Sequence, residues 1–179
     1  IVGGGTVALS MVEAYRASFP GARFTVWSRT PDTMRDFADR TGATPAADLE
    51  AAVRRAEIIA TATMSTVPLI RGDWLSPGTH LDLIGAYRPD MRGADDAALR
   101  RARVFVDARA TTLRHIGELM QPLAAGVIAE SDVIADFYDL PKGTFARQSN
   151  DEITLCKNGG GAHLDLMTAR YILDAARGD

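Results

Sequence analysis

The stretch that decides the fold class is Ile1-Val2-Gly3-Gly4-Gly5-Thr6-Val7-Ala8, at the start of the sequence. Two β-branched residues lead into three glycines, and an amphipathic segment from Thr6 to Ser18 follows. The pattern G-x-G-x-x-[GA] between a strand end and a helix start is typical of a Rossmann phosphate loop, although three glycines also suit a plain flexible turn. The amides at the helix N-terminus and its partial positive charge favour phosphate binding. We expect a dinucleotide diphosphate to contact Gly3, Gly4, Gly5, Thr6 and Val7.

Outward from this loop, apolar clusters alternate with helical stretches, which predicts an α/β fold. We expect a Rossmann-type, doubly wound, mostly parallel sheet with helices on both faces. The expected strands lie at 23–27, 58–62, 80–84, 104–106 and 152–155, and the expected helices at 6–18, 31–40, 48–56, 95–103, 112–120 and 162–176. The last helix carries an apolar face that we expect to pack on the core, formed by Leu164, Met167, Tyr171 and Leu173.

The first strand is short in this sequence. Only Ile1 and Val2 precede the first glycine, whereas such a strand needs about five residues. We therefore expect a truncated strand, with further residues upstream of Ile1 in the parent protein. Residues 1–150 are predicted to form the dinucleotide-binding domain, and residues 151–179 a C-terminal strand and helix that close it.

The end of the second strand bears on which dinucleotide is bound. NAD enzymes commonly place an acidic residue there to bind the ribose hydroxyls. This chain has Ser28, Arg29 and Thr30 instead, and no acidic residue before Asp32. An arginine can hold a 2′-phosphate with paired charged hydrogen bonds, but it is also a common solvated surface residue. We predict NADP(H) as the preferred cofactor, with NAD(H) possible.

Composition excludes several classes of function. A net charge of −3 gives no basic surface for nucleic acid or for an anionic membrane. No apolar run approaches the ~20 residues of a membrane span, and no His/Cys/Asp spacing indicates a metal site. The one cysteine, Cys156, fits a reducing compartment and is expected to be a buried hydrophobe, so we predict a cytoplasmic protein.

Several stretches together resemble the ornithine cyclodeaminase/mu-crystallin family. They occur in order along nearly the whole chain, at residues 3–8, 27–30, 62–68, 77–80, 84–92 and 148–158. The resemblance implies a two-domain protein of which this chain is the cofactor half. An N-terminal portion outside this sequence would build most of the substrate site and the dimer interface, so we expect a homodimer acting on a small amino or imino acid.

The resemblance also implies further cofactor contacts. Thr63, Met64 and Ser65 would lie beside the adenine and ribose, at a strand end where an ordinary loop is the alternative. The nicotinamide would lie near Ile84, Gly85 and Ala86 on one side and near Asn158 and Gly159 on the other.

One departure from the family pattern bears on the activity. The cyclodeaminases carry a catalytic aspartate where this chain has Tyr87. A phenol with a pKa near 10 does not replace a carboxylate as a base at neutral pH. The leading hypothesis is therefore an NADPH-dependent reductase of a cyclic imino acid such as pyrroline- or piperideine-2-carboxylate. An NAD-dependent ornithine cyclodeaminase and a non-catalytic NADPH-binding crystallin-like protein remain alternatives, and no catalytic residue is assigned within this chain.

Overall fold

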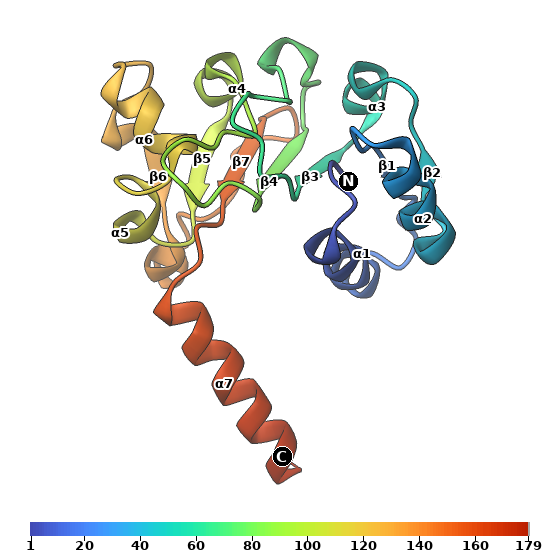
Figure 1. The fold of residues 1–179 in the computed structure, drawn as a ribbon. Coiled ribbons are helices and arrows are strands. Elements are labelled where there is room, and N and C mark those ends of the chain that lie inside the picture. Colours follow the sequence, from blue (N-terminus) through green and yellow to red (C-terminus); the bar gives the residue numbers. More distant parts are fainter. Residues whose placement is uncertain (179) are drawn as a thin grey trace.

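Parallel pairing joins each strand to its neighbours in the computed structural model, which describes residues 1–178 (Figure 1). One sheet has the order β3-β4-β7-β5-β6 and a second pairs β1 with β2. Val2 connects them, because it forms parallel bridges to Trp27 and to Thr61. The strands are β1 (Thr25–Val26), β2 (Thr44–Pro45), β3 (Ile58–Thr61), β4 (His80–Leu83), β5 (Arg103–Val106), β6 (Val133–Ala135) and β7 (Thr154–Lys157).

Proline, glycine and capping aspartates set the ends of several helices. Pro31 occupies the first turn of α2, and Gly42 ends that helix with a left-handed φ of 72°. Asp48 and Asp95 cap α3 and α4 by accepting bonds from backbone amides three residues on. The helices are α1 (Thr6–Ser18), α2 (Pro31–Thr41), α3 (Leu49–Arg55), α4 (Asp96–Arg101), α5 (Arg109–Thr112), α6 (Gly117–Ala124) and α7 (Ala162–Arg177), with 3₁₀ turns η1 (Gly72–Trp74), η2 (Glu130–Asp132) and η3 (Phe137–Lys142).

Two hydrophobic clusters lie on opposite faces of the sheet. Side chains of α3, α4 and α6 pack on Ile59, Leu81 and Leu155. The other cluster joins α1 and α2 to Val26 and Ala62. Since successive strand residues point to opposite faces, the clusters use alternate positions of the strands. The predicted α/β Rossmann-type sheet with helices on both faces is confirmed.

The predicted helix 112–120 is wrong. Residues 113–116 interrupt it, so α5 ends at Thr112 and α6 begins at Gly117. The interruption brings Gly117 against another loop, where its amide donates to the Arg88 carbonyl over 3.0 Å. A Cβ at this position would lie 2.4 Å from the Pro89 carbonyl oxygen, so only glycine fits. The strand expected at 23–27 is also shorter than predicted, and β2 and β6 were not predicted.

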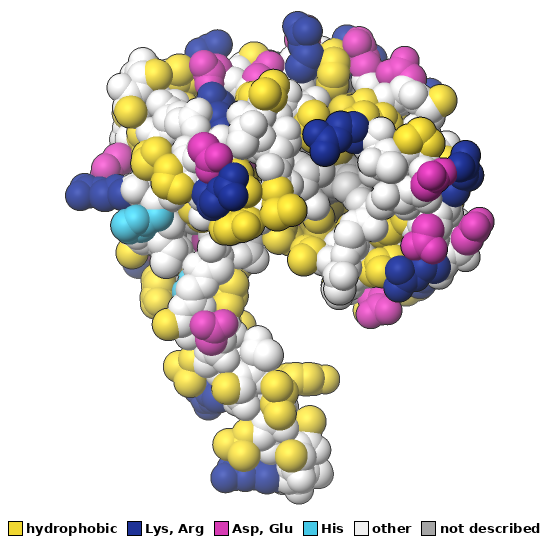
Figure 2. All heavy atoms as spheres, in the orientation of Figure 1, with side chains coloured by type: hydrophobic (Ala, Val, Ile, Leu, Met, Phe, Trp, Pro, Cys, Tyr) yellow, Lys and Arg dark blue, Asp and Glu magenta, His cyan; other side chains and the backbone are white. Residues whose placement is uncertain are grey.

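Helix α7 projects away from the sheet, and the prediction that it packs on the core is also wrong (Figure 1). None of its residues is buried, and Tyr171 and Met167 are 75% and 62% exposed. Figure 2 shows apolar side chains along this helix. Within residues 1–178 no helix has both the length and the apolar character needed to cross a bilayer.

Candidate functional site

All the cofactor contacts expected from the sequence lie where strands end. Because the strands are parallel, their carboxyl ends meet at one edge of the sheet, the usual ligand edge of such folds. The five segments follow Val2 (Gly3, Gly4, Gly5, Thr6, Val7), β1 (Ser28, Arg29, Thr30), β3 (Thr63, Met64, Ser65), β4 (Ile84, Gly85, Ala86) and β7 (Asn158, Gly159). We call this region the carboxyl edge.

The glycine loop at this edge is held by its backbone. Gly3 has a φ of 107°, and its amide donates to the Trp27 carbonyl over 2.9 Å. A Cβ on Gly3 would lie 2.8 Å from the Ala62 carbonyl oxygen, so glycine is required for both reasons. Gly5 differs, since it is extended and a Cβ there would meet no atom within 4 Å. The loop is therefore packed behind Gly3 and open in front of Gly5.

The N-terminus of α1 faces that open space. No side chain caps it, and its first turn contains no acidic residue. The first amides of a helix have no partner within the helix and carry partial positive charge. The arrangement fits an anion, and the residues that would hold a diphosphate are those of the loop from Gly3 to Val7.

A second uncapped helix N-terminus lies beside the first. Thr30 is the N-cap of α2, but its side chain makes no capping bond. A Cβ on Gly4 would meet the Thr33 Cγ2 at 2.8 Å, so the glycine loop touches the first turn of α2. Arg29 is exposed and makes no hydrogen bond or ion pair among the described residues. This corner therefore offers an unpaired guanidinium and a hydroxyl to a second anionic group.

The segments after β3 and β4 touch each other. A Cβ on Gly85 would lie 2.1 Å from the Thr63 carbonyl oxygen, which leaves no room for any other residue. The buried hydroxyl of Thr63 has no hydrogen-bond partner in the part of the chain described. The Tyr87 hydroxyl lies 3.8 Å from the Met64 sulfur, and its ring is 57% exposed. Tyr87 thus lines the edge, and within residues 1–178 its hydroxyl is hydrogen-bonded to no acid or base.

A hollow of about 320 Å³ lies next to Tyr87. It is lined by Thr111, His115 and Ile116 from the segment after β5, and by the glycines 159–161 after β7. A larger cavity of about 920 Å³ lies at the opposite edge, beside Phe24 and Ile58 at the amino ends of β1 and β3. Because ligands of parallel sheets bind at the carboxyl ends, the smaller hollow belongs to the candidate site.

Sequence reasoning missed three buried charged residues near this edge: Asp107, Glu118 and Lys157. The Asp107 carboxylate accepts from the amide of Gly159 over 3.0 Å. Glu118 accepts from the amides of Gly93 and Ala94 at 2.7 and 3.0 Å, and burial raises its pKa. For Lys157, the sequence signal was a lysine at the end of the apolar strand β7. Its burial could not be predicted, because it depends on β4 and β5, which lie on either side.

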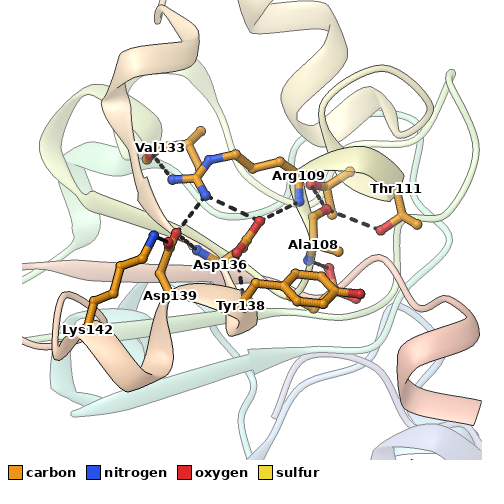
Figure 3. A network of polar contacts seen from close by, with 10 residues as sticks. Ala108, Arg109, Thr111, Val133, Asp136, Tyr138, Asp139 and Lys142 are labelled. Carbon is orange, nitrogen blue, oxygen red and sulfur yellow. Dashed lines mark hydrogen bonds and ion pairs between the residues drawn. The ribbon is translucent and has the colours of Figure 1, made fainter. Parts of the chain in front are cut away.

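An ion-pair network braces the adjacent strand ends (Figure 3). The Arg109 guanidinium donates to Asp139 at 2.8 Å and to the Val133 carbonyl at 3.0 Å, and lies 3.2 Å from Asp136. Lys142 donates to the other Asp139 oxygen at 2.7 Å. Arg109, and then Lys142, hold the pKa of Asp139 below its ordinary value. The network fixes α5 against η3, and its carboxylates are committed to these partners.

Two further side chains that could be reactive, Cys156 and His80, are partly buried. Burial raises the pKa of Cys156 to about 12, so its thiol is protonated at neutral pH. The Nδ1 atom of His80 lies 2.8 Å from the Thr154 hydroxyl, and burial lowers its pKa. No group of three potential metal ligands occurs within residues 1–178.

Comparison with known proteins gives consistent matches. The sequence model of the ornithine cyclodeaminase/mu-crystallin family matches residues 1–179. A Δ1-pyrroline-2-carboxylate reductase of Paracoccus denitrificans is 54% identical over 96% of this chain and 57% of its own length. The chain thus spans little more than half of that relative.

Two solved structures share the fold. The Δ1-pyrroline-2-carboxylate reductase of Thermococcus litoralis, in complex with NADH and L-proline, matches with a TM-score of 0.87 and 25% identity. The match covers 99% of this chain and 58% of that protein. An archaeal alanine dehydrogenase dimer with bound NAD matches with a TM-score of 0.87 and 27% identity, over 99% of this chain and 57% of that one.

Proposed function

This chain belongs to the ornithine cyclodeaminase/mu-crystallin family, and from that premise we propose that it is the cofactor-binding half of a reductase of small cyclic imino acids. The substrate would be of the pyrroline- or piperideine-2-carboxylate type, as the name of the Paracoccus relative suggests. The observation that carries the proposal is the uncapped N-terminus of α1 behind an open Gly5, at the carboxyl edge.

The cofactor site that we propose runs along the carboxyl edge. The diphosphate lies on Gly3, Gly4, Gly5, Thr6 and Val7, and the adenosine ribose on Ser28, Arg29 and Thr30. Thr63, Met64 and Ser65 lie beside the adenine and ribose, and the buried Thr63 hydroxyl has no hydrogen-bond partner among the described residues. Ile84, Gly85 and Ala86 support one side of the nicotinamide, and Asn158 and Gly159 the other.

We propose NADPH as the preferred dinucleotide. The unpaired Arg29, the free Thr30 hydroxyl and the uncapped start of α2 would together bind a 2′-phosphate. The first acidic residue after β1 is Asp32, in the first turn of α2, where its carboxylate is paired with Arg35. The Thermococcus enzyme and the archaeal alanine dehydrogenase hold NADH and NAD, so the preference rests on this corner alone.

When bound, the nicotinamide would supply the hydride that reduces the carbon of a C=N bond. The chain's own residues bind and orient it. Tyr87 and the three glycines 159–161 border the hollow where the imine would lie. We assign no acid or base within this chain, because the Tyr87 hydroxyl donates to the Met64 sulfur and to no acid or base among the described residues.

The remaining machinery belongs to a domain that we place upstream of Ile1. The exposed apolar side chains of α7 would pack against it, since large exposed apolar patches commonly mark interaction surfaces. In this arrangement residues 1–150 form the Rossmann domain, and residues 151–179 supply β7 and the helix that leads to the other domain. We propose a homodimer, as in the archaeal alanine dehydrogenase, and a cytoplasmic location, which the free thiol of Cys156 favours.

The test is a set of turnover assays on the complete protein. NADPH with pyrroline-2-carboxylate should be consumed, as followed by absorbance, and NADH should be a poorer reductant. Release of ammonia from ornithine with NAD+ would instead identify a cyclodeaminase. Tight NADPH binding without turnover of either substrate would identify a binding protein, and failure to bind either dinucleotide would refute the cofactor site.

A further inference from the structure

Lys157 is a fully buried lysine at the end of the central strand β7. Its relative exposure is 0%, and the sheet places it between Leu83 of β4 and Val106 of β5. A buried ammonium is costly unless its protons are all bonded. From this position its side chain reaches the backbone segments that follow β4 and β7.

The ammonium uses its three protons on carbonyl oxygens of that backbone. The Nζ atom lies 3.0 Å from the Leu83 oxygen, 2.7 Å from the Ala86 oxygen and 2.6 Å from the Asn158 oxygen. A fourth carbonyl, that of Ile84, lies 3.4 Å away. The Lys157 ammonium thus bonds carbonyls of the turn that follows β4, and it also bonds the carbonyl of the first residue after β7.

These contacts join the two segments that we place on either side of the nicotinamide. Ile84, Gly85 and Ala86 form the turn after β4, and Asn158 begins the turn after β7. The amide of Asn158 also donates to the Leu83 carbonyl over 3.1 Å. The Lys157 ammonium adds a second connection between the two segments. It bonds the carbonyls of Ala86 and Asn158, which lie beyond the last residues of β4 and β7.

We propose that Lys157 is a positioning residue, which holds the turn Ile84–Ala86 against Asn158 and thereby shapes the surface that receives the nicotinamide ring. The proposal rests on the proposed cofactor site. Lys157 takes no part in the chemistry itself, because its protons point to the backbone and its side chain is closed to solvent.

The charge of Lys157 changes within an accessible pH range. Burial lowers its pKa to about 8, although the nearby acidic groups of Glu118, Asp107 and Asp82, together with Cys156, oppose that shift. The neutral amine has two protons and a lone pair, so it cannot bond all three carbonyls. Above pH 8 the turn should therefore lose one of its bonds while the rest of the carboxyl edge is unchanged.

The first experiment needs no variant. Affinity for the nicotinamide dinucleotide is measured by calorimetry from pH 7 to pH 9.5, beside that for the matching fragment without the ring, ADP-ribose or its 2′-phosphate. We expect dinucleotide affinity to fall relative to fragment affinity above about pH 8. A constant ratio across this range would overturn the proposal.

The second experiment compares Lys157→Met with Lys142→Met. Lys142 is the other lysine of this chain, and its side chain is 69% exposed. Lys157→Met takes the ammonium from the Ala86 and Asn158 carbonyls, while the Leu83 carbonyl keeps its bond from the Asn158 amide. Dinucleotide affinity should therefore fall about tenfold or more, with fragment affinity changed less than about twofold. The pH dependence of the ratio should disappear. Lys142→Met removes one exposed ion pair and leaves Arg109 to hold Asp139, so its two affinities and their ratio should match those of the wild type.

Each outcome bears on one proposal or the other. If the wild type binds no dinucleotide, the proposed function fails, and the role of Lys157 fails with it. If the wild type binds normally and Lys157→Met has the same dinucleotide affinity and kcat, only the positioning role is refuted. If Lys157→Met does not fold, the pH series on the wild type decides alone.

Discussion

Gly5→Ala should separate cofactor binding from folding. Gly5 adopts φ −86° and ψ −175°, an extended conformation that alanine also adopts, and a Cβ there would meet no protein atom within 4 Å. The new methyl group would stand where the structure leaves the front of the glycine loop open. In our assignment that space belongs to the diphosphate.

The expected magnitudes differ for the two properties. Alanine is a poorer N-cap than glycine by about 0.5–1 kcal/mol, and restricting the unfolded chain returns about 0.4–1 kcal/mol. The free energy of unfolding should therefore change by less than about 1 kcal/mol. Displacing the diphosphate from one backbone amide removes a charged hydrogen bond of about 1.5–3 kcal/mol, which weakens dinucleotide affinity by roughly 10- to 150-fold.

Calorimetric titration with NADPH measures the affinity, and urea unfolding measures the stability. Gly21→Ala is the matched control, because a Cβ at Gly21 also meets nothing within 4 Å and Gly21 lies before β1, away from the carboxyl edge. We expect it to match the wild type in both measurements. Wild-type affinity in Gly5→Ala would show that the diphosphate does not approach this loop, and the site would have to be reassigned.

Four further variants test other parts of the structure. Arg29→Ala should weaken NADPH by about 1.5–3 kcal/mol more than NADH in titrations; equal losses would mean that Arg29 does not bind the 2′-phosphate. Gly85→Ala, whose Cβ would lie 2.1 Å from the Thr63 carbonyl oxygen, should lower the free energy of unfolding by about 2 kcal/mol or more, and an unchanged urea midpoint would contradict the contact. Glu118→Gln replaces an acceptor of two amide bonds with one acceptor and one donor, so urea unfolding should report a loss of about 1–3 kcal/mol. Lys157 has a folded pKa of about 8 against an ordinary 10.5, so between these values the unfolded chain holds a proton that the folded chain has lost. Its contribution to stability should therefore rise with pH by up to about 3 kcal/mol, and subtracting the Lys157→Met curve from the wild-type curve should expose a rise that begins near pH 8; a flat difference would refute the shift.

The candidate site was predictable in outline because its signals are local. A glycine loop between a strand and a helix needs only consecutive residues, and the Ser28-Arg29-Thr30 corner follows a strand that alternation reveals. The carboxyl ends of parallel strands then place both segments at one edge. Their cofactor roles stay predictions until they are measured.

Other features depend on which segments become neighbours. Strand β7 lies between β4 and β5, although it is the last strand in the chain. The break before Gly117 arises from the approach of the loop at Arg88 and Pro89. Amphipathic periodicity in α7 correctly predicts a helix, but it does not say whether its apolar face meets this sheet or another partner.

The sequence by itself determined most of the succession of strands and helices and the chemistry offered at the strand ends, since side-chain periodicity and turn residues act over a few positions. Only the tertiary structure decided that Lys157 and Glu118 are buried and which carbonyls and amides they bond. Apart from the adjacent Asn158 carbonyl, the groups that compensate the cost of burying these two charges lie 24 to 74 residues away in the sequence. Local sequence patterns do not show which of these distant groups become neighbours.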